Sequence, residues 1–126
     1  MSLMQLLRVI PKIFYADIRQ GLQLFIDTLG FSVGYYEPDP QPFYVIKRDN
    51  VTLILSQDAE FALKDRPEIR IAVDDIEALY GEVTARNPRM LHPNSPLIKT
   101  QPWGLREFAL RDDSDVCVII QQDVHE

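Results

Sequence analysis

Two stretches of this 126-residue sequence follow the same hairpin pattern, and this internal repeat restricts the possible folds more than any other feature. The first stretch spans residues 43–55 around the turn pair Asp49-Asn50, and the second spans residues 106–120 around the polar tetrad 112–115. Short apolar runs on both sides of polar turn residues are typical of β-hairpins. We therefore expect a fold that contains one unit twice.

A strand pattern and a helix pattern precede the first hairpin. Residues 6–15 form a predicted strand, and Pro11 places it at a sheet edge because proline cannot donate to a β-ladder. Asp17 begins a predicted helix with the spacing of a capping box, and apolar residues recur at helical intervals up to Gly30, which ends it. Residues 31–37 form the next predicted strand.

The second half repeats this order of elements. Residues 68–73 form a predicted strand, Asp74 begins a helix that Asn87-Pro88 ends, and a possible strand at 97–100 precedes the second hairpin. A repeat of strand, helix and three strands predicts an α+β fold with helices on one sheet face. We expect one domain over residues 4–126, with modules 6–57 and 68–122 and a connector at 58–67.

Charge and cysteine content restrict the partners and the compartment. The formal net charge of −6 argues against nucleic acid and anionic membrane surfaces, because both bind basic proteins. The apolar runs are far shorter than the roughly 20 residues needed to cross a bilayer. One cysteine, Cys117, excludes a disulfide within the chain. We expect a cytoplasmic protein without a membrane anchor.

Three stretches together resemble a known family. They are the helix end Leu29-Gly30-Phe31, the segment Val73-Asp74-Asp75-Ile76, and the segment from Trp103 to Phe108 before the acidic turn. In this order and spacing the sequence resembles the glyoxalase/bleomycin-resistance/dioxygenase family, also called the vicinal-oxygen-chelate fold. The resemblance implies two βαβββ modules with curved mixed sheets, and a homodimer whose cups hold small molecules. The turn departs from the family pattern, with Asp113 in place of proline and Asp115 in place of glycine.

The resemblance also implies where a metal ion binds in the metal-dependent members. Four side chains supply its ligands, and carried onto this sequence they are Ile10, Ile54, Glu68 and Ile119. Divalent cations need oxygen or imidazole ligands, which isoleucine lacks. The two histidines, His92 and His125, lie outside these places and are expected to be ordinary surface residues. We expect no metal, no other cofactor and no catalytic residues.

Alternation along the strands assigns side chains to the face away from the helices. A four-residue turn at 112–115 would pair Phe108 with Ile119 and Arg106 with Gln121. The predicted face is apolar with isolated charges, as in sites for small organic molecules. The alternative is a packed dimer face with a structural Arg106–Glu107 ion pair. The candidate ligand-binding residues are Lys12, Phe14, Phe43, Val45, Ile54, Glu68, Arg70, Trp103, Arg106, Phe108 and Ile119.

The resemblance and the aliphatic metal places lead to one favoured hypothesis. The chain is predicted to be a dimeric, non-metal protein that sequesters an apolar or aromatic small molecule in a dimer-built cup. The second hypothesis is a metal-dependent lyase, isomerase or dioxygenase of the same fold. The third is an interaction module whose open sheet face is covered by its partner subunit.

Overall fold

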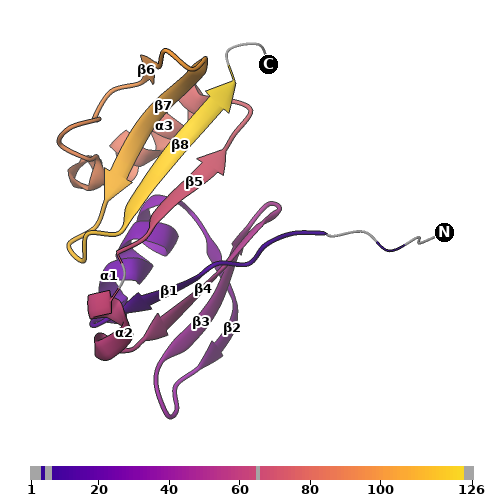
Figure 1. Cartoon of the computed structure of the whole chain (residues 1–126), viewed down its shortest axis with the longest axis vertical. Coiled ribbons are helices and arrows are strands. Elements are labelled where there is room, and N and C mark those ends of the chain that lie inside the picture. Colours follow the sequence, from indigo (N-terminus) through magenta and orange to yellow (C-terminus); the bar gives the residue numbers. More distant parts are fainter. Residues whose placement is uncertain (1–3, 5–6, 65, 124–126) are drawn as a thin grey trace.

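The computed structural model describes residues 4, 7–64 and 66–123, which form two four-stranded sheets (Figure 1). Parallel pairs join β1 to β4 and β5 to β8, and the other pairs are antiparallel. The predicted α+β fold of two modules is confirmed. The first sheet has the order β1-β4-β3-β2, with β1 at Lys12–Tyr15, β2 at Ser32–Glu37, β3 at Phe43–Arg48 and β4 at Val51–Gln57. The second has the order β5-β8-β7-β6, with β5 at Glu68–Ala72, β6 at Lys99–Thr100, β7 at Leu105–Arg111 and β8 at Cys117–Asp123.

The helices begin and end close to the predicted residues. Asp17 caps the first helix, because its Oδ1 accepts a hydrogen bond of 3.1 Å from the Arg19 N–H, and Gly30 follows its end with a φ of +75°. The predicted capping box does not form, since the side chain of Gln20 bonds to Ser114 instead. The helices are α1 (Ile18–Leu22), its π-helical continuation η1 (Gln23–Thr28), α2 (Ala59–Lys64), α3 (Ile76–Arg86) and the short η2 (Pro88–Met90).

The predicted first strand is longer than the observed one. Strand β1 covers only 12–15, whereas residues 7–10 extend away from the sheets (Figure 1), and residue 6 lies outside the described residues. Leu7 and Val9 are 84% and 86% exposed. Pro11 has no backbone N–H to donate to a neighbouring strand. Within the described chain, no strand pairs with residues 7–10. The segment is therefore an exposed, largely apolar arm.

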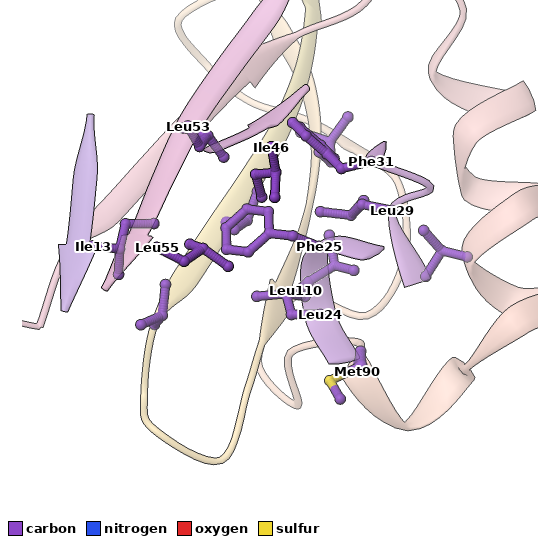
Figure 2. Packing of buried hydrophobic residues seen from close by; sticks show 14 of the residues in the cluster. Ile13, Leu24, Phe25, Leu29, Phe31, Ile46, Leu53, Leu55, Met90 and Leu110 are labelled. Carbon is purple, nitrogen blue, oxygen red and sulfur yellow. The ribbon is translucent and has the colours of Figure 1, made fainter. Parts of the chain in front are cut away.

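Both modules contribute to one hydrophobic core. Leu24 and Phe25 from η1 belong to the same buried cluster as Leu110 from β7 and Met90 from η2 (Figure 2). Each large apolar side chain that is fully buried stabilises the fold by roughly 1.5–3 kcal/mol. The strand residues predicted to lie under the helices are in this cluster, including Leu53, Leu55, Val116, Val118 and Ile120. The opposite face of each sheet, called the open face below, lies outside it.

The second hairpin has a longer loop than predicted. Arg111 pairs with Cys117, so five residues connect the strands instead of four. The carboxylate of Asp112 accepts hydrogen bonds from the backbone N–H groups of Ser114 at 2.9 Å and Val116 at 3.0 Å, and this holds the extra residue in the loop. In the first hairpin Arg48 pairs with Val51, as predicted. The one-residue difference changes every cross-strand pair between β7 and β8.

Candidate functional site

The open face of the first sheet brings five predicted site residues together. Lys12 pairs with Ile54, which pairs with Val45 on its other side. Phe14 and Phe43 form the neighbouring row, because both pair with Ser56. The Lys12 ammonium lies 5.2 Å from the ring centroid of Phe14 and 5.4 Å from that of Phe43. These distances are within the range of cation–π interactions, so the two rows form one surface.

Two aromatic residues outside the predicted set extend this surface. Phe61 of α2 stacks on Phe14 with ring centroids 5.1 Å apart. Tyr35 of β2 makes an edge contact with Phe43 at 6.5 Å. The strand pairing shifts between Val33 and Tyr35, and this irregularity places Tyr35 opposite Val45 and so on the open face. The two-residue alternation along a strand predicts neither a contact from a neighbouring helix, as for Phe61, nor a β-bulge, as before Tyr35.

The open face of the second sheet contains three further predicted residues. Glu68 pairs with Cys117, and Arg70 pairs with Ile119, so these side chains share a face as expected. On the neighbouring strand β7, Ala109 lies opposite Ile119 and Glu107 lies opposite Gln121. The open face therefore carries Glu107, which the predicted register assigned to the opposite face.

Two predicted site residues lie on the helix side instead. Phe108 pairs with Ile120, is 1% exposed and makes an edge contact with Tyr80 of α3 at 5.0 Å. Arg106 forms its ion pair with Glu77 of α3. Their predicted placement on the open face was wrong, because the five-residue loop shifts β7 by one position and reverses its faces.

Glu107 is the polar centre of the second open face. Its Oε2 accepts a hydrogen bond of 3.2 Å from the indole N–H of Trp103 and one of 2.9 Å from Arg70. Glu107 is only 7% exposed, whereas Trp103 is 62% exposed. Arg70 also forms an ion pair with Glu68, with 3.4 Å between its Nε and Oε2 of Glu68. The predicted Arg106–Glu107 ion pair is replaced by this network of Trp103, Glu107, Arg70 and Glu68.

A cavity of about 540 Å³ lies beside this network. It is lined by residues 94–99 and Gln101 of the loop before β7, and by Glu107, Phe108, Ala109 and Ile119 of the sheet. Its volume is within the usual range for small-molecule sites. A second cavity, of about 580 Å³, lies between the end of the β3–β4 hairpin and α3 and contains none of the predicted site residues. We therefore place the candidate site on the open faces and the adjoining 540 Å³ cavity.

Comparisons with known proteins agree with this architecture. No family model matches the sequence. The bleomycin resistance protein of Geobacillus stearothermophilus is 29% identical over 135 aligned positions, which cover 93% of this chain and 98% of that protein. The bleomycin-binding protein of Streptomyces verticillus, solved with copper(II)-bleomycin, has a TM-score of 0.72 at 24% identity and covers 94% of this chain and 97% of its own. A glyoxalase/bleomycin resistance protein/dioxygenase superfamily member from Sphaerobacter thermophilus has a TM-score of 0.68 at 20% identity, with 92% of this chain and 97% of its own covered.

The chain is therefore similar in sequence to bleomycin resistance proteins, and its fold is that of a solved member of the glyoxalase/bleomycin resistance protein/dioxygenase superfamily. The places that the resemblance assigns to metal ligands hold Ile10, Ile54, Glu68 and Ile119. Glu68 is the one oxygen donor among them, and Arg70 forms an ion pair with it. Four side chains with a single carboxylate do not fit a divalent cation. Within the described ranges, no group of three or more His, Cys, Asp or Glu side chains is placed to hold a metal ion.

The remaining predictions concern the histidines and the membrane. His92 is half-buried in the loop before β6, and its Nδ1 accepts a hydrogen bond of 3.0 Å from the Asn94 N–H. His125 lies outside the described residues. None of the helices in the described part of the chain has the length and apolar character needed to span a bilayer.

Proposed function

We propose that this chain binds a small apolar or aromatic molecule and sequesters it without making or breaking a bond. The observation that carries the proposal is the open face of the first sheet, where aromatic and aliphatic side chains surround an isolated charge. A cavity of about 540 Å³ adjoins the open face of the second sheet. The similar proteins support it, because one is a bleomycin resistance protein and another binds bleomycin. Removal of apolar ligand surface from water supplies the binding free energy, and the few charges orient the ligand.

The proposed ligand-binding side chains come from both sheets. Phe108 and Arg106 are not part of the open face, because they face the helices, although Phe108 also borders the 540 Å³ cavity. Glu107 and the aromatic ring of Phe61 are additions to the predicted set. The first sheet supplies Lys12, Phe14, Phe43, Val45 and Ile54, and the second supplies Glu68, Arg70, Trp103 and Ile119.

The proposed functional form is a homodimer whose cups are built by both copies. Two observations support this form. The open face of each sheet lies outside the single core cluster, and the apolar arm at 7–10 is exposed. A second copy would cover these surfaces and enclose the ligand.

The proposal treats residues 4–126 as one domain in the cytoplasm. One core cluster that includes side chains of both modules supports a single domain. A free, half-buried Cys117 suits a reducing compartment. Burial raises the pKa of its thiol, which keeps the thiol protonated and poorly reactive.

Calorimetric titration of metal-free bleomycin into chelator-treated protein tests the binding function. We expect saturable binding, and we expect Phe43→Ala to weaken it by about tenfold because Phe43 is a wall of the open face. Tyr36→Ala is the matched control, since Tyr36 stacks on Tyr44 at 4.5 Å on the other face of the same strands. Equal affinities for both variants would contradict the site. Binding or turnover that needs an added divalent ion would favour the enzyme hypothesis.

Sedimentation velocity tests the dimer. We expect one species at twice the mass of 14.6 kDa, and a shift toward the monomer when Val9 is replaced by Asp in the exposed arm. Asp49→Asn in the β3–β4 turn is the control, because this side chain is exposed and lies away from the open faces. A monomer at all concentrations would contradict the proposed form. A dimer whose melting temperature is not raised by any aromatic ligand would favour the third hypothesis, an interaction module whose open face is covered by the partner subunit.

A further inference from the structure

The cavity of about 580 Å³, called the α3 cavity below, lies between the two modules. Its first side is formed by residues 48–51 of the β3–β4 hairpin, and its second by residues 71–75 with Ala78, Leu79 and Glu82 of α3. Its volume is within the usual range for small-molecule sites. The side chains proposed for the open-face site do not line it, so an occupant of the α3 cavity would not compete with a ligand there.

The floor of the α3 cavity is an edge of the hydrophobic core. Leu29, Phe31 and Ile120 line it and belong to the buried cluster. Further apolar side chains of the lining are only partly buried and pack against that cluster: Val51, Ile71, Val73 and Leu79. An apolar guest would remove this surface from water, which favours binding.

The charged side chains of the lining are mainly acidic. They are the carboxylates of Asp49, Asp74, Asp75 and Glu82 and one guanidinium, that of Arg48. Arg48 donates to both carboxylate oxygens of Glu82 at 3.1 Å, so these two charges largely cancel. The three aspartates are exposed, and the nearest printed cation, Arg48, lies 3.8 Å from Asp49. The mouth of the cavity therefore carries a net negative charge, which attracts cations.

The rim on the second module is held in place by hydrogen bonds. Gln122 donates to the carbonyl oxygen of Asp74 at 2.8 Å and accepts from the N–H of Ile76 at 2.8 Å. Asp75 accepts from the N–H of Ala78 at 3.1 Å. These bonds occupy two N–H groups at the start of α3 and so weaken its attraction for anions. Among the residues that the structure describes, no three metal-ligating side chains converge on one point. The charge at the mouth therefore suits an organic cation.

We propose that the α3 cavity is a second binding site, and that it takes an organic amine on an apolar body. The apolar body occupies the floor at the edge of the core. The ammonium group lies at the mouth, between Asp49 of the first module and Asp74 of the second. The inference goes beyond the proposed function and does not depend on it, because the two sites share no side chain.

Titrations of the full chain followed by nuclear magnetic resonance test the site and its charge preference. The probes are phenylbutylamine, phenylbutanol and phenylbutyrate, which share one apolar body and differ in charge. We expect the amine to shift the backbone amide signals of residues 49–51 and 71–79, and to bind about three- to tenfold more tightly than the alcohol, with the acid weakest. Equal affinities for amine and alcohol would overturn the proposal. Shifts confined to residues 12–14 and 43–45 of the open face, or no shift with the amine, would overturn it as well.

Variants at exposed positions separate the charge from the cavity. Asp49→Asn and Asp74→Asn are each expected to weaken amine binding by about two- to threefold and to leave alcohol binding unchanged. Asp113→Asn is the matched control, because it removes the same charge from an exposed position of the β7–β8 loop, outside the lining. Ala78→Phe fills the cavity from an exposed position of α3 and should weaken all three probes. Unchanged amine affinity in the double variant Asp49→Asn/Asp74→Asn, or in Ala78→Phe, would overturn the proposal.

Discussion

The hydroxyl of Tyr15 donates a hydrogen bond of 2.6 Å to Oδ2 of Asp112, across 97 positions of the sequence. Both residues are buried, and the bond joins the end of β1 in the first module to the β7–β8 loop in the second. Arg66 donates to the carbonyl oxygens of Phe14 and Ser114 at the same junction. Burial raises the pKa of both the Tyr15 hydroxyl and the Asp112 carboxyl. A buried polar link therefore connects the modules in addition to their shared core.

Removal of this link should destabilise the fold. Tyr15→Phe leaves a buried carboxylate oxygen without its donor, so we expect the free energy of unfolding to fall by about 1–3 kcal/mol. Urea denaturation followed by circular dichroism measures the change. The control is Tyr35→Phe, whose hydroxyl donates to the exposed Glu37 and whose loss should change stability by less than about 0.5 kcal/mol. Equal losses in the two variants would contradict a structural role for the Tyr15–Asp112 bond.

Two glycines in helices should respond to alanine in opposite directions. A Cβ atom at Gly21 would lie 2.4 Å from Cε2 of the buried Tyr15 ring, so Gly21→Ala should destabilise the protein by about 1–3 kcal/mol. A Cβ atom at Gly81 of α3 meets nothing within 4 Å. Gly81→Ala should therefore stabilise the protein by about 0.4–1 kcal/mol, because alanine favours a helix interior. Thermal unfolding of the two variants checks the sign, and a stabilising Gly21→Ala would contradict the packing of Tyr15 against α1.

Glu82 should make stability depend on pH. Hydrogen bonds from Arg48, at 3.1 Å, lower the pKa of Glu82 below its ordinary value of 4.5. The folded state therefore favours the ionised carboxylate, so this contribution is complete above pH 4.5 and decreases as the pH falls through the lowered folded-state pKa. Both side chains are about one-third exposed, and we expect Glu82→Gln to cost only about 0.5–1 kcal/mol near pH 7.

The pH dependence of that difference is the test. Urea denaturation of the wild type and Glu82→Gln should give unfolding free energies that converge as the pH falls from about 6 to about 3. The control variant is Glu60→Gln. It makes the same substitution in a more exposed ion pair, which Glu60 forms with Lys64 at 3.7 Å within α2. A difference in unfolding free energy that grows at low pH would contradict a stabilising interaction between Arg48 and the ionised Glu82 carboxylate.

The register of β7 predicts different roles for two phenylalanines. Phe108 is buried against Tyr80, so Phe108→Ala should reduce the free energy of unfolding by about 3–5 kcal/mol. Phe14 is half-buried on the open face, and Phe14→Ala should reduce stability less while it weakens ligand binding. Chemical denaturation and calorimetric titration measure the two effects. A Phe108→Ala variant that remains stable but loses ligand binding would contradict the observed register of β7 and support the register predicted from the sequence.

The two hairpins show which part of the fold the sequence predicts and which it does not. Alternation and the turn pair Asp49-Asn50 are sufficient for the first hairpin, because its two-residue turn is closed by the backbone. The second loop depends on the Asp112 side chain, whose bonds to two backbone N–H groups hold five residues in the loop. Nothing in the local pattern distinguishes a loop of the four polar residues 112–115 from a five-residue loop that also includes Val116. The fold and the residues on the open face of the first sheet were therefore predictable, whereas the face of β7 was not.

The site also includes contacts that arise only from tertiary packing. Phe61 reaches the open face from a helix that the sequence analysis treated as a connector. Glu107 lies on the open face only in the observed register. There it accepts a hydrogen bond from Trp103, which belongs to the loop before β7. Local periodicity carries no information about such partners, because they are set by loop length and by neighbouring elements.

The central claim is that the chain holds a small apolar or aromatic guest without help from a metal ion. Fluorescence of Trp103 during titration of metal-free bleomycin, in the continuous presence of a chelator, tests it most directly. The account predicts a saturable change in emission, unchanged ligand after release, and the same curve for protein that was first incubated with zinc, manganese or iron and then freed of unbound ion. Binding that appears only with the protein incubated with a divalent ion, or a ligand that is recovered as a chemically altered product, would contradict it.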